Sequence, residues 1–348
     1  MAAAKGTILV TGANGGLGSA IVKQVVSNPE LAAFHGLYAV RDAAAAPSLR
    51  AALAGNPSHA HDIFSQNLTN LDSVRLTASA IVTRIAAGEI PPIRVLILCA
   101  GCRDFGKQTW SEDGLDATFG GNYLGHWLLT LLLLGSMEKE NGRIVIIGTQ
   151  AHDPYDKRNV STKAFIEDKY KTIIHHETSV QEIAQGNWSW GSAQEDQSFQ
   201  GGTRRYGAAK LFLIMFQHEL QRRLDRDPAL TRICILGVDP GTMITGLPRH
   251  APWFIRVLIF QIVFPIIAAL MPNGPVRTTL KSASHVVSAA LDSTPELGEY
   301  PKDRYLNGLE PFETSAESRD LKKAELVWKE SVRLAQLKRE ETSLVDWQ

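Results

Sequence analysis

The hydrophobic residues of this 348-residue chain gather in short runs that alternate with helical patterns. Strand-like runs occupy residues 7–10, 37–40, 94–98, 143–147 and 232–237. Between the first two, Ile21, Val22, Val25 and Val26 recur at the spacing of an amphipathic helix. Strands that alternate with helices are joined by right-handed βαβ crossovers, which build a parallel sheet. The pattern therefore predicts an α/β fold with a doubly wound parallel sheet.

The first strand-like run leads directly into a glycine-rich turn. Glycine permits positive φ and a close approach of the backbone to a ligand, and the free N–H groups of the following helix can hold a pyrophosphate. The spacing Gly-x-x-x-Gly-x-Gly differs from the common dinucleotide fingerprint, so an ordinary turn without a ligand remains an alternative. The residues predicted to bind the phosphates are Thr11, Gly12, Asn14, Gly16, Leu17 and Gly18.

Tyr206 and Lys210 stand four residues apart, which places both side chains on one face of a helix. An ammonium beside a phenol favours the phenolate and can bring its pKa down from the ordinary value of about 10. A tyrosine in that setting can act as a general acid or base. The same spacing is also common on solvated helices, where it has no catalytic meaning.

Read together, the motifs Thr11-Gly12-x-x-x-Gly16-x-Gly18, Asn122, Thr149, Tyr206-x-x-x-Lys210 and Pro240-Gly241 resemble the short-chain dehydrogenase/reductase family. The landmarks occur in the family's order and span the chain up to about residue 245. The string that begins at Asn122 particularly resembles the retinol dehydrogenase and protochlorophyllide reductase branch. The resemblance implies a Rossmann-type fold in a single domain, with the cofactor across the carboxyl ends of the strands.

The resemblance also implies the catalytic roles. Tyr206 would exchange a proton with the substrate oxygen, and Lys210 would hold the nicotinamide ribose while favouring the phenolate. Asn122 would shape its helix and hold a water that links the lysine to solvent. Thr149 stands where the family has a serine that bonds the substrate oxygen. Threonine keeps the hydroxyl but adds a methyl group, which would narrow the pocket.

The end of the second strand-like run favours NADP(H) over NAD(H). Val40 is followed by Arg41, whose guanidinium suits a 2′-phosphate, although the next residue, Asp42, leaves NAD(H) open. Asn67 stands where the family often has an aspartate beside the adenine. The further residues that the resemblance implies around the cofactor are Leu68, Ala100, Gly101, Val238, Pro240, Gly241, Thr242 and Thr245.

Two segments depart from a minimal member of the family. Tyr206 follows Thr149 by 57 positions, whereas about a dozen are expected, so residues 151–203 are interpreted as an inserted, lid-like segment. Residues 246–275 form an apolar region, for which core or substrate lid, dimer face and interfacial membrane contact are the ranked alternatives. Its charge-free part falls short of the about 20 residues that a membrane span needs. The candidate substrate contacts are His152, Trp188, Trp190 and Met243.

Composition narrows the class of protein further. Lys plus Arg and Asp plus Glu both number 36, and this balance argues against a nucleic-acid footprint. Cys99, Cys102 and Cys234 are interpreted as structural thiols, and no metal site is assigned. The N-terminus has no apolar signal sequence, which favours the cytoplasm, with peripheral membrane contact and a homodimer left open. Residues 1–318 are assigned to the Rossmann domain and 319–348 to a charged C-terminal helix packed on the surface.

These features predict an NADP(H)-dependent oxidoreductase that reduces a carbonyl, or oxidises the alcohol, of a small apolar substrate. A retinoid, a steroid and a secondary metabolite are the candidate substrates, and the insertion together with Thr149 favours a dedicated biosynthetic reductase. Reduction of a C=C bond in an enone is one alternative. A redox-silent nucleotide-binding scaffold is another, which the intact Asn122, Tyr206 and Lys210 disfavour. A third is a redox-silent isomerase or dehydratase that uses Tyr206 without net hydride transfer.

Overall fold

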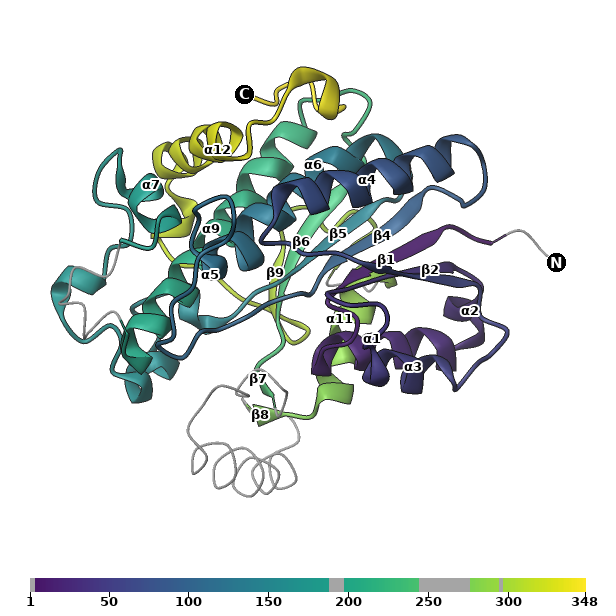
Figure 1. The fold of residues 1–348 in the computed structure, drawn as a ribbon, viewed down its shortest axis with the longest axis horizontal. Coiled ribbons are helices and arrows are strands. Elements are labelled where there is room, and N and C mark those ends of the chain that lie inside the picture. The colour runs from purple at the N-terminus through teal and green to yellow at the C-terminus, as the bar shows by residue number, and fades with distance from the viewer. Residues whose placement is uncertain (1–3, 188–196, 244–275, 294–296) are drawn as a thin grey trace.

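A computed structural model describes residues 4–187, 197–243, 276–293 and 297–348 (Figure 1). The strands are β1 Thr7–Thr11, β2 His35–Val40, β3 His61–Ser65, β4 Ile93–Leu98, β5 Arg143–Ile147, β6 Cys234–Asp239, β7 Thr242–Met243, β8 Val276–Arg277, β9 Tyr305–Asn307 and β10 Glu310–Pro311. The α-helices are α1 Gly16–Ser27, α2 Pro29–Ala32, α3 Pro47–Leu53, α4 Leu71–Ala86, α5 Ala117–Phe119, α6 Gly125–Leu133, α7 Ser179–Ala184, α9 Phe199–Leu224, α11 Thr279–Leu291 and α12 Leu321–Ala335.

The main sheet has the strand order β10-β9-β6-β5-β4-β1-β2-β3, and all pairs except β9 with β10 are parallel. The chain enters at β1, winds outward to β3, crosses back to β4 and winds the other way. This confirms the predicted doubly wound Rossmann-type sheet. The winding reverses between β1 and β4, and the crevice outside the carboxyl ends of these strands is where such folds bind ligands.

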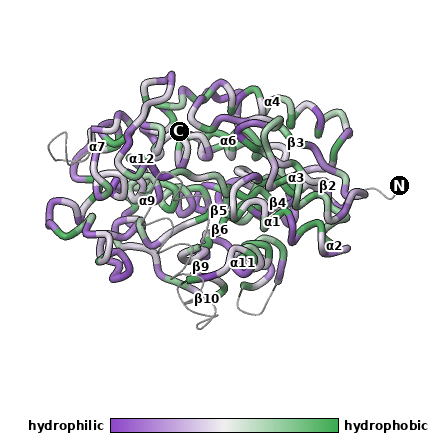
Figure 2. The backbone as a smooth tube through the Cα atoms, turned by 60° about the horizontal axis from the view of Figure 1, so that its bottom comes forward, coloured by the Kyte–Doolittle hydropathy of each residue, from purple (hydrophilic) through white to green (hydrophobic). Residues whose placement is uncertain are grey.

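Helices cover both faces of the sheet, so its central strands are buried on both sides (Figure 1). On β1, Leu9 belongs to a hydrophobic cluster that includes residues of α4, α6, α9 and α12, whereas Ile8 and Val10 belong to a cluster that includes residues of α1, α3 and α11. The residues on both faces of β1 are apolar, which explains the continuous hydrophobic run in the sequence. Along the helices hydrophobic and hydrophilic residues are mixed, as a helix with one face on a sheet requires (Figure 2).

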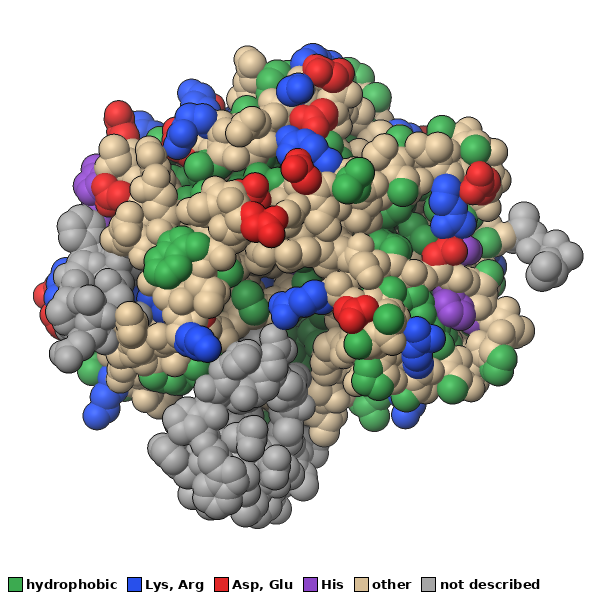
Figure 3. All heavy atoms as spheres, viewed as in Figure 1, with side chains coloured by type: hydrophobic (Ala, Val, Ile, Leu, Met, Phe, Trp, Pro, Cys, Tyr) green, Lys and Arg blue, Asp and Glu red, His purple; other side chains and the backbone are tan. Residues whose placement is uncertain are grey.

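Acidic and basic side chains are interspersed on the face of the molecule in Figure 3. That distribution agrees with the formal net charge of zero. No helix within the described residues is both long enough and apolar enough to cross a membrane.

The structure departs from the sequence-based predictions in three elements. The edge strand β3 escaped prediction because only two of its five residues, Ile63 and Phe64, are apolar, so it lacks a continuous hydrophobic run. In the insertion, Phe165, Tyr170 and Ile174 are buried in the core, so this part is not an open surface loop. In α12, Trp328 is only 1% exposed and packs edge-on against Trp127, so the helix lies deeper than its charged sequence suggests. The apolar region 246–275, with Thr245, Trp188 and Trp190, lies outside the described residues.

Candidate active site

The carboxyl ends of β1, β4, β5 and β6 lie at one edge of the sheet and bring most of the predicted site residues together. Each of these strands is followed within two or three residues by part of the site. The residues placed in this way are Gly12, Ala100, Gly101, Thr149, Pro240 and Gly241. Tyr206 and Lys210 reach the same edge from α9, because the Lys210 ammonium donates to the carbonyl of Ile147, the last residue of β5.

The glycine turn after β1 is shaped by contacts that exclude side chains. Gly12 has a φ of +66°, and a Cβ atom there would lie 2.7 Å from the Ala100 Cα. A Cβ on Gly18 would lie 2.2 Å from the Gly12 carbonyl oxygen. Gly15, the N-cap of α1, supplies no side chain to cap the first N–H groups of the helix. These groups fit a pyrophosphate, as the sequence predicted for this turn.

Thr11 holds the ends of β1 and β4 together instead of facing solvent. Its hydroxyl oxygen accepts hydrogen bonds from the backbone N–H groups of Cys99 at 2.9 Å and Ala100 at 3.0 Å. It also lies 3.0 Å from Nε2 of His126, whose pKa burial lowers to about 3, so that this imidazole is neutral. Thr11 therefore positions the strand ends that form the crevice.

At the end of β2, Arg41 is available for a ligand whereas its neighbours are engaged. Arg41 is exposed, and no hydrogen bond or ion pair joins its side chain to the part of the chain that the structure describes. The Asp42 carboxylate accepts from the Ala44 backbone N–H at 2.9 Å. Asn14 accepts from the backbone N–H groups of Ser48 and Leu49, so its amide caps the start of α3 and is not free for phosphate.

After β3, Asn67 is exposed, and its amide oxygen accepts from the backbone N–H and the hydroxyl of Thr69. Leu68 is buried, and its carbonyl oxygen would lie 2.1 Å from a Cβ on Gly125. The loop therefore packs closely on the start of α6, which fixes its place beside the crevice.

Asn122 lies in a single π-helical turn, Gly120–Leu124, between α5 and α6. Its amide oxygen accepts from the Cys102 N–H at 3.0 Å, and its amide nitrogen donates to the carbonyls of Cys102 at 2.9 Å and Thr118 at 2.7 Å. Asn122 thus joins a distorted helix to the loop after β4. The predicted role of shaping the helix matches these contacts, while the water relay stays a prediction.

Lys210 is buried next to Tyr206, with its nitrogen 5.8 Å from the centroid of the phenol ring. It donates to the Ile147 carbonyl at 2.8 Å. Burial lowers the pKa of Lys210 to about 8. The helical spacing read from the sequence therefore places an ammonium with an altered pKa beside the tyrosine.

The balance of charges at Tyr206 differs from the prediction, which had Lys210 favouring the phenolate. Burial raises the pKa of Tyr206 to about 12, and the nearby Arg103 guanidinium and a hydrogen bond from Thr149 lower it less. Burial has the larger effect on the pKa because a phenolate at this position would lose its hydration. At neutral pH Tyr206 therefore holds its proton and can donate it.

Thr149 caps the short 3₁₀ helix Gln150–His152 by accepting from the Ala151 N–H at 3.3 Å. His152, predicted as a substrate contact, is 1% exposed. Its Nδ1 lies 2.7 Å from the Thr149 carbonyl oxygen, and its Nε2 accepts from the Ser315 N–H at 3.1 Å. His152 therefore links the Thr149 loop to the C-terminal part of the chain, and its contact with a substrate stays a prediction.

The turn after β6 is held by an ion pair whose carboxylate is buried and whose arginine is partly exposed. Asp239 is 1% exposed and accepts from Arg158 at 3.0 Å and from the Gly241 N–H at 2.9 Å. Gly241 has a φ of +75°, which favours glycine. Thr242 and Met243 are half-buried and pair as β7 with β8. The insertion, through Arg158, therefore fixes the turn predicted to contact the cofactor.

Four residues of this site, Arg103, His126, Arg158 and Asp239, were not among the residues predicted from the sequence. Arg158 and Asp239 are 81 positions apart, so no local spacing signals their pairing. His126 lies in the sequence that follows Asn122, and only the folded structure reveals that it is buried. Arg103 does have a local signal in the sequence, because it is a charged residue that closely follows the apolar run of the buried strand β4.

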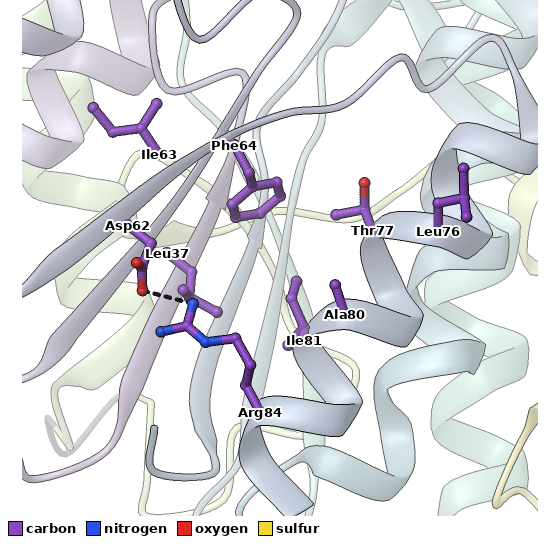
Figure 4. Close-up of a pocket in the computed structure, with 9 residues that line it drawn as sticks. All are labelled: Leu37, Asp62, Ile63, Phe64, Leu76, Thr77, Ala80, Ile81 and Arg84. Carbon is purple, nitrogen blue, oxygen red and sulfur yellow. Dashed lines mark hydrogen bonds and ion pairs between the residues drawn. The ribbon is translucent and has the colours of Figure 1, made fainter. Parts of the chain in front are cut away.

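The structure also has a cavity of about 380 Å³ that is separate from this site (Figure 4). It lies between the edge strand β3 and α4, lined by Phe64, Leu76 and Ile81 among others. At its side, Arg84 and Asp62 form an ion pair of 2.9 Å. None of the predicted site residues lines it.

The chain is similar to proteins of one family. The family model described as short chain dehydrogenase matches residues 6–173. Over 365 aligned residues, covering 99% of both proteins, the chain is 40% identical to the short-chain dehydrogenase iccH of Talaromyces variabilis. The chain therefore belongs to the short-chain dehydrogenase/reductase family and is an oxidoreductase of that family.

More distant similarities agree with this assignment. The chain is 29% identical to a chloroplastic protochlorophyllide reductase of Daucus carota, over 96% of this chain and 79% of that protein. The crystal structure of the angucycline C-6 ketoreductase LanV with bound NADP superposes with a TM-score of 0.54 at 16% identity, covering 90% of this chain and 96% of that one. The first similarity confirms the predicted branch, and the second confirms the fold.

Proposed function

We propose that the protein is an NADPH-dependent reductase that transfers a hydride to the carbonyl carbon of an apolar substrate. The observation that carries this proposal is a protonated tyrosine, Tyr206, held beside the Thr149 hydroxyl and the Lys210 ammonium at the mouth of the crevice. The glycine turn across that crevice fits the pyrophosphate of a dinucleotide.

Each residue has a distinct part in this reaction. The nicotinamide, when bound, supplies the hydride. The Tyr206 hydroxyl donates its proton to the developing alkoxide, and the Thr149 hydroxyl orients the substrate oxygen. Lys210 stabilises the phenolate that Tyr206 becomes, and Asn122 keeps the loop after β4 in place. Backbone groups of Val238, Pro240 and Gly241, with Thr242, would hold the nicotinamide end.

The preference for NADPH is supported by Arg41, which is exposed at the end of β2 and lacks a partner among the described residues. A guanidinium suits the planar, bidentate recognition of a phosphate. The carboxylate of the neighbouring Asp42 already accepts a hydrogen bond from the Ala44 backbone N–H, which makes it a poorer partner for the ribose hydroxyls of NADH. The structurally similar LanV holds NADP, which agrees with this assignment.

Reduction of a C=C bond is the second candidate. It is supported by the similarity to protochlorophyllide reductases, which extends over 96% of this chain. In that case Tyr206 would protonate a carbon atom in place of an oxygen. The first candidate and a secondary-metabolite substrate are supported by two similar structures, the angucycline C-6 ketoreductase LanV and the reductase LugOII, which catalyses keto-reduction during lugdunomycin biosynthesis.

The test is oxidation of NADPH, followed at 340 nm, with panels of ketones, enones and polyketide-like aromatics. We expect turnover with ketones, no turnover by Tyr206→Phe, and almost unchanged NADPH affinity in that variant, because the phenol acts on the substrate and Lys210 remains. Turnover of enones alone would select the second candidate. Absence of both NADPH binding and turnover, or full activity of Tyr206→Phe, would refute the assigned chemistry.

A further inference from the structure

The loop that follows β4 presents a guanidinium next to the catalytic tyrosine. The Arg103 Cζ lies 6.0 Å from the ring centroid of Tyr206 and also contacts two neighbouring aromatic rings, 4.9 Å from the centroid of Phe105 and 4.7 Å from that of Phe199. Its Nη2 donates to the hydroxyl of Thr203. Two aromatic faces and one hydroxyl hold this cation in a single place beside the reacting group.

The charge of Arg103 is not neutralised by its surroundings. Its Nε is shielded from solvent and has no hydrogen-bond partner, and within the described residues no carboxylate forms an ion pair with it. The adjacent Asp104 is committed to Arg205 at 2.8 Å. A buried donor on a charged group without a partner is costly, and such a cost is retained where a ligand can offset it.

The backbone around Arg103 is itself strained and tightly packed. Phe105 has a φ of +53°, an uncommon conformation for an aromatic residue. A Cβ on the following Gly106 would lie 2.4 Å from the Gln197 carbonyl oxygen at the start of α9. Strain of this kind persists only where the surrounding structure enforces it, and it concentrates at functional sites. The loop is therefore built to fix the guanidinium and not merely to connect two elements.

The second cation near Tyr206 is Lys210, whose ammonium is bound to the neutral carbonyl of Ile147. The carboxylates that face this region, Asp104 and Asp239, are each paired with an arginine. The space in front of Tyr206 thus carries a surplus of positive charge, which favours a negatively charged ligand.

We propose that Arg103 binds an anionic oxygen of the substrate, and that the substrates are therefore carbonyl compounds carrying a carboxylate or an ionised enol or phenol a few bonds from the reacting carbon. This specificity rests on the proposed reductase function and deepens it. Arg103 selects the substrate and orients it, so that its carbonyl oxygen lies at the hydroxyls of Tyr206 and Thr149.

A phosphate of the cofactor is the other source of an anionic oxygen. The pyrophosphate site at the N-terminus of α1 and the 2′-phosphate site at Arg41 already account for the cofactor's charges. Arg103, by contrast, stands at Tyr206, where the substrate must lie. The affinity for NADPH separates the two sources, because a cofactor contact would weaken it when Arg103 is replaced.

The experiment compares keto acids with their methyl esters, which differ only in charge. The probes are 3-aroylpropionates with phenyl, naphthyl and anthracenyl groups, and their esters. Binding to the full-length protein is measured by titration calorimetry with and without NADP+, which requires no turnover. Turnover of the same compounds is measured with NADPH. The variants are Arg103→Gln, Arg103→Lys as the charge-preserving change, and Lys107→Gln as a matched control, since Lys107 is exposed on the same loop.

We expect at least one acid to bind roughly ten- to a hundredfold more tightly than its ester, the size of a hydrogen bond to a charged group. Arg103→Gln should lose this preference through KM more than kcat, while Arg103→Lys keeps part of it and Lys107→Gln keeps it all. NADPH affinity should stay unchanged in every variant.

Equal binding of every acid and its ester, no binding of any acid, a preference that survives Arg103→Gln, or a loss of NADPH affinity in that variant would each overturn the proposal. Failure of the reductase function has a different signature. It would appear as absence of turnover with esters and acids alike, while the acid preference in binding persists. Where Arg103→Gln does not fold, the wild-type comparison and Arg103→Lys still decide.

Discussion

The buried lysine proposed to assist catalysis, Lys210, should make the protein less stable, and a variant without its charge should show this. Lys210 is 3% exposed, and its ammonium has one hydrogen bond, to the Ile147 carbonyl. In Lys210→Met a side chain of similar length replaces the buried cation. We expect this variant to lose turnover, because the cation beside Tyr206 is gone, and to gain stability at pH 7.

The size of the gain follows from the pKa of Lys210, which burial lowers from 10.5 to about 8. Holding the charge at pH 7 then costs the folded state on the order of 3 kcal/mol. Methionine removes this cost but leaves the Ile147 carbonyl without its donor, which costs about 1 to 2 kcal/mol. The free energy of unfolding should therefore rise by about 1 to 2 kcal/mol at pH 7.

The pH dependence has a definite sign. Between the folded pKa of about 8 and the ordinary value of 10.5, the unfolded wild type binds the proton that the folded one has released, so its stability rises with pH. Lys210→Met lacks this contribution. Its advantage should therefore shrink through that interval and be gone or reversed near pH 10.

Urea unfolding of both proteins at pH 7 and at pH 10, followed by circular dichroism, measures this difference, with Lys23→Met on the exposed face of α1 as the control. A variant that is less stable than the wild type at pH 7 by 1 kcal/mol or more, or a difference that does not change with pH, would refute the reasoning. Either result would mean that interactions other than the hydrogen bond to the Ile147 carbonyl offset the cost of burying the ammonium.

Three further changes probe the rest of the site. Gly18→Ala places a Cβ 2.2 Å from the Gly12 carbonyl oxygen, so it should displace α1 and lower NADPH affinity more than tenfold by titration calorimetry; unchanged affinity would contradict the phosphate turn. Arg41→Ser should raise KM for NADPH roughly tenfold or more and leave KM for NADH unchanged, whereas equal effects on both would remove the 2′-phosphate role. Arg158→Met leaves the buried carboxylate of Asp239 without its cation and should lower the free energy of unfolding in urea by about 2 to 4 kcal/mol; a loss below about 0.5 kcal/mol would show that the pair is dispensable.

The central fold and the core of the site could be predicted because their signals are local. A strand such as β1, buried on both faces, shows a continuous apolar run, and a helix shows Tyr206 and Lys210 at one-turn spacing. The glycines of the turn are required by sterics, which act within a few residues. The resemblance to the family then supplied the order in which these pieces meet.

Other features could not be read from the sequence because they depend on residues far apart in the chain. The pKa of Tyr206 is set by burial, which only the packed structure defines. His152 seemed to lie in a polar loop, yet Ser315 covers it from the C-terminal part of the chain. The place of Arg103 beside Tyr206 depends on Phe105 and Phe199, which are almost a hundred positions apart and both contact its guanidinium.

The burial of α12 bears on the stability of α9. Trp328 packs against Trp127 and Phe216, and Arg223 of α9 binds Asp346 and the carbonyl of Gln348. Trp328 therefore completes part of the hydrophobic core around the helix that carries Tyr206 and Lys210. Removing α12 would expose apolar surface of α9 and favour aggregation, even though none of the predicted site residues lies in α12.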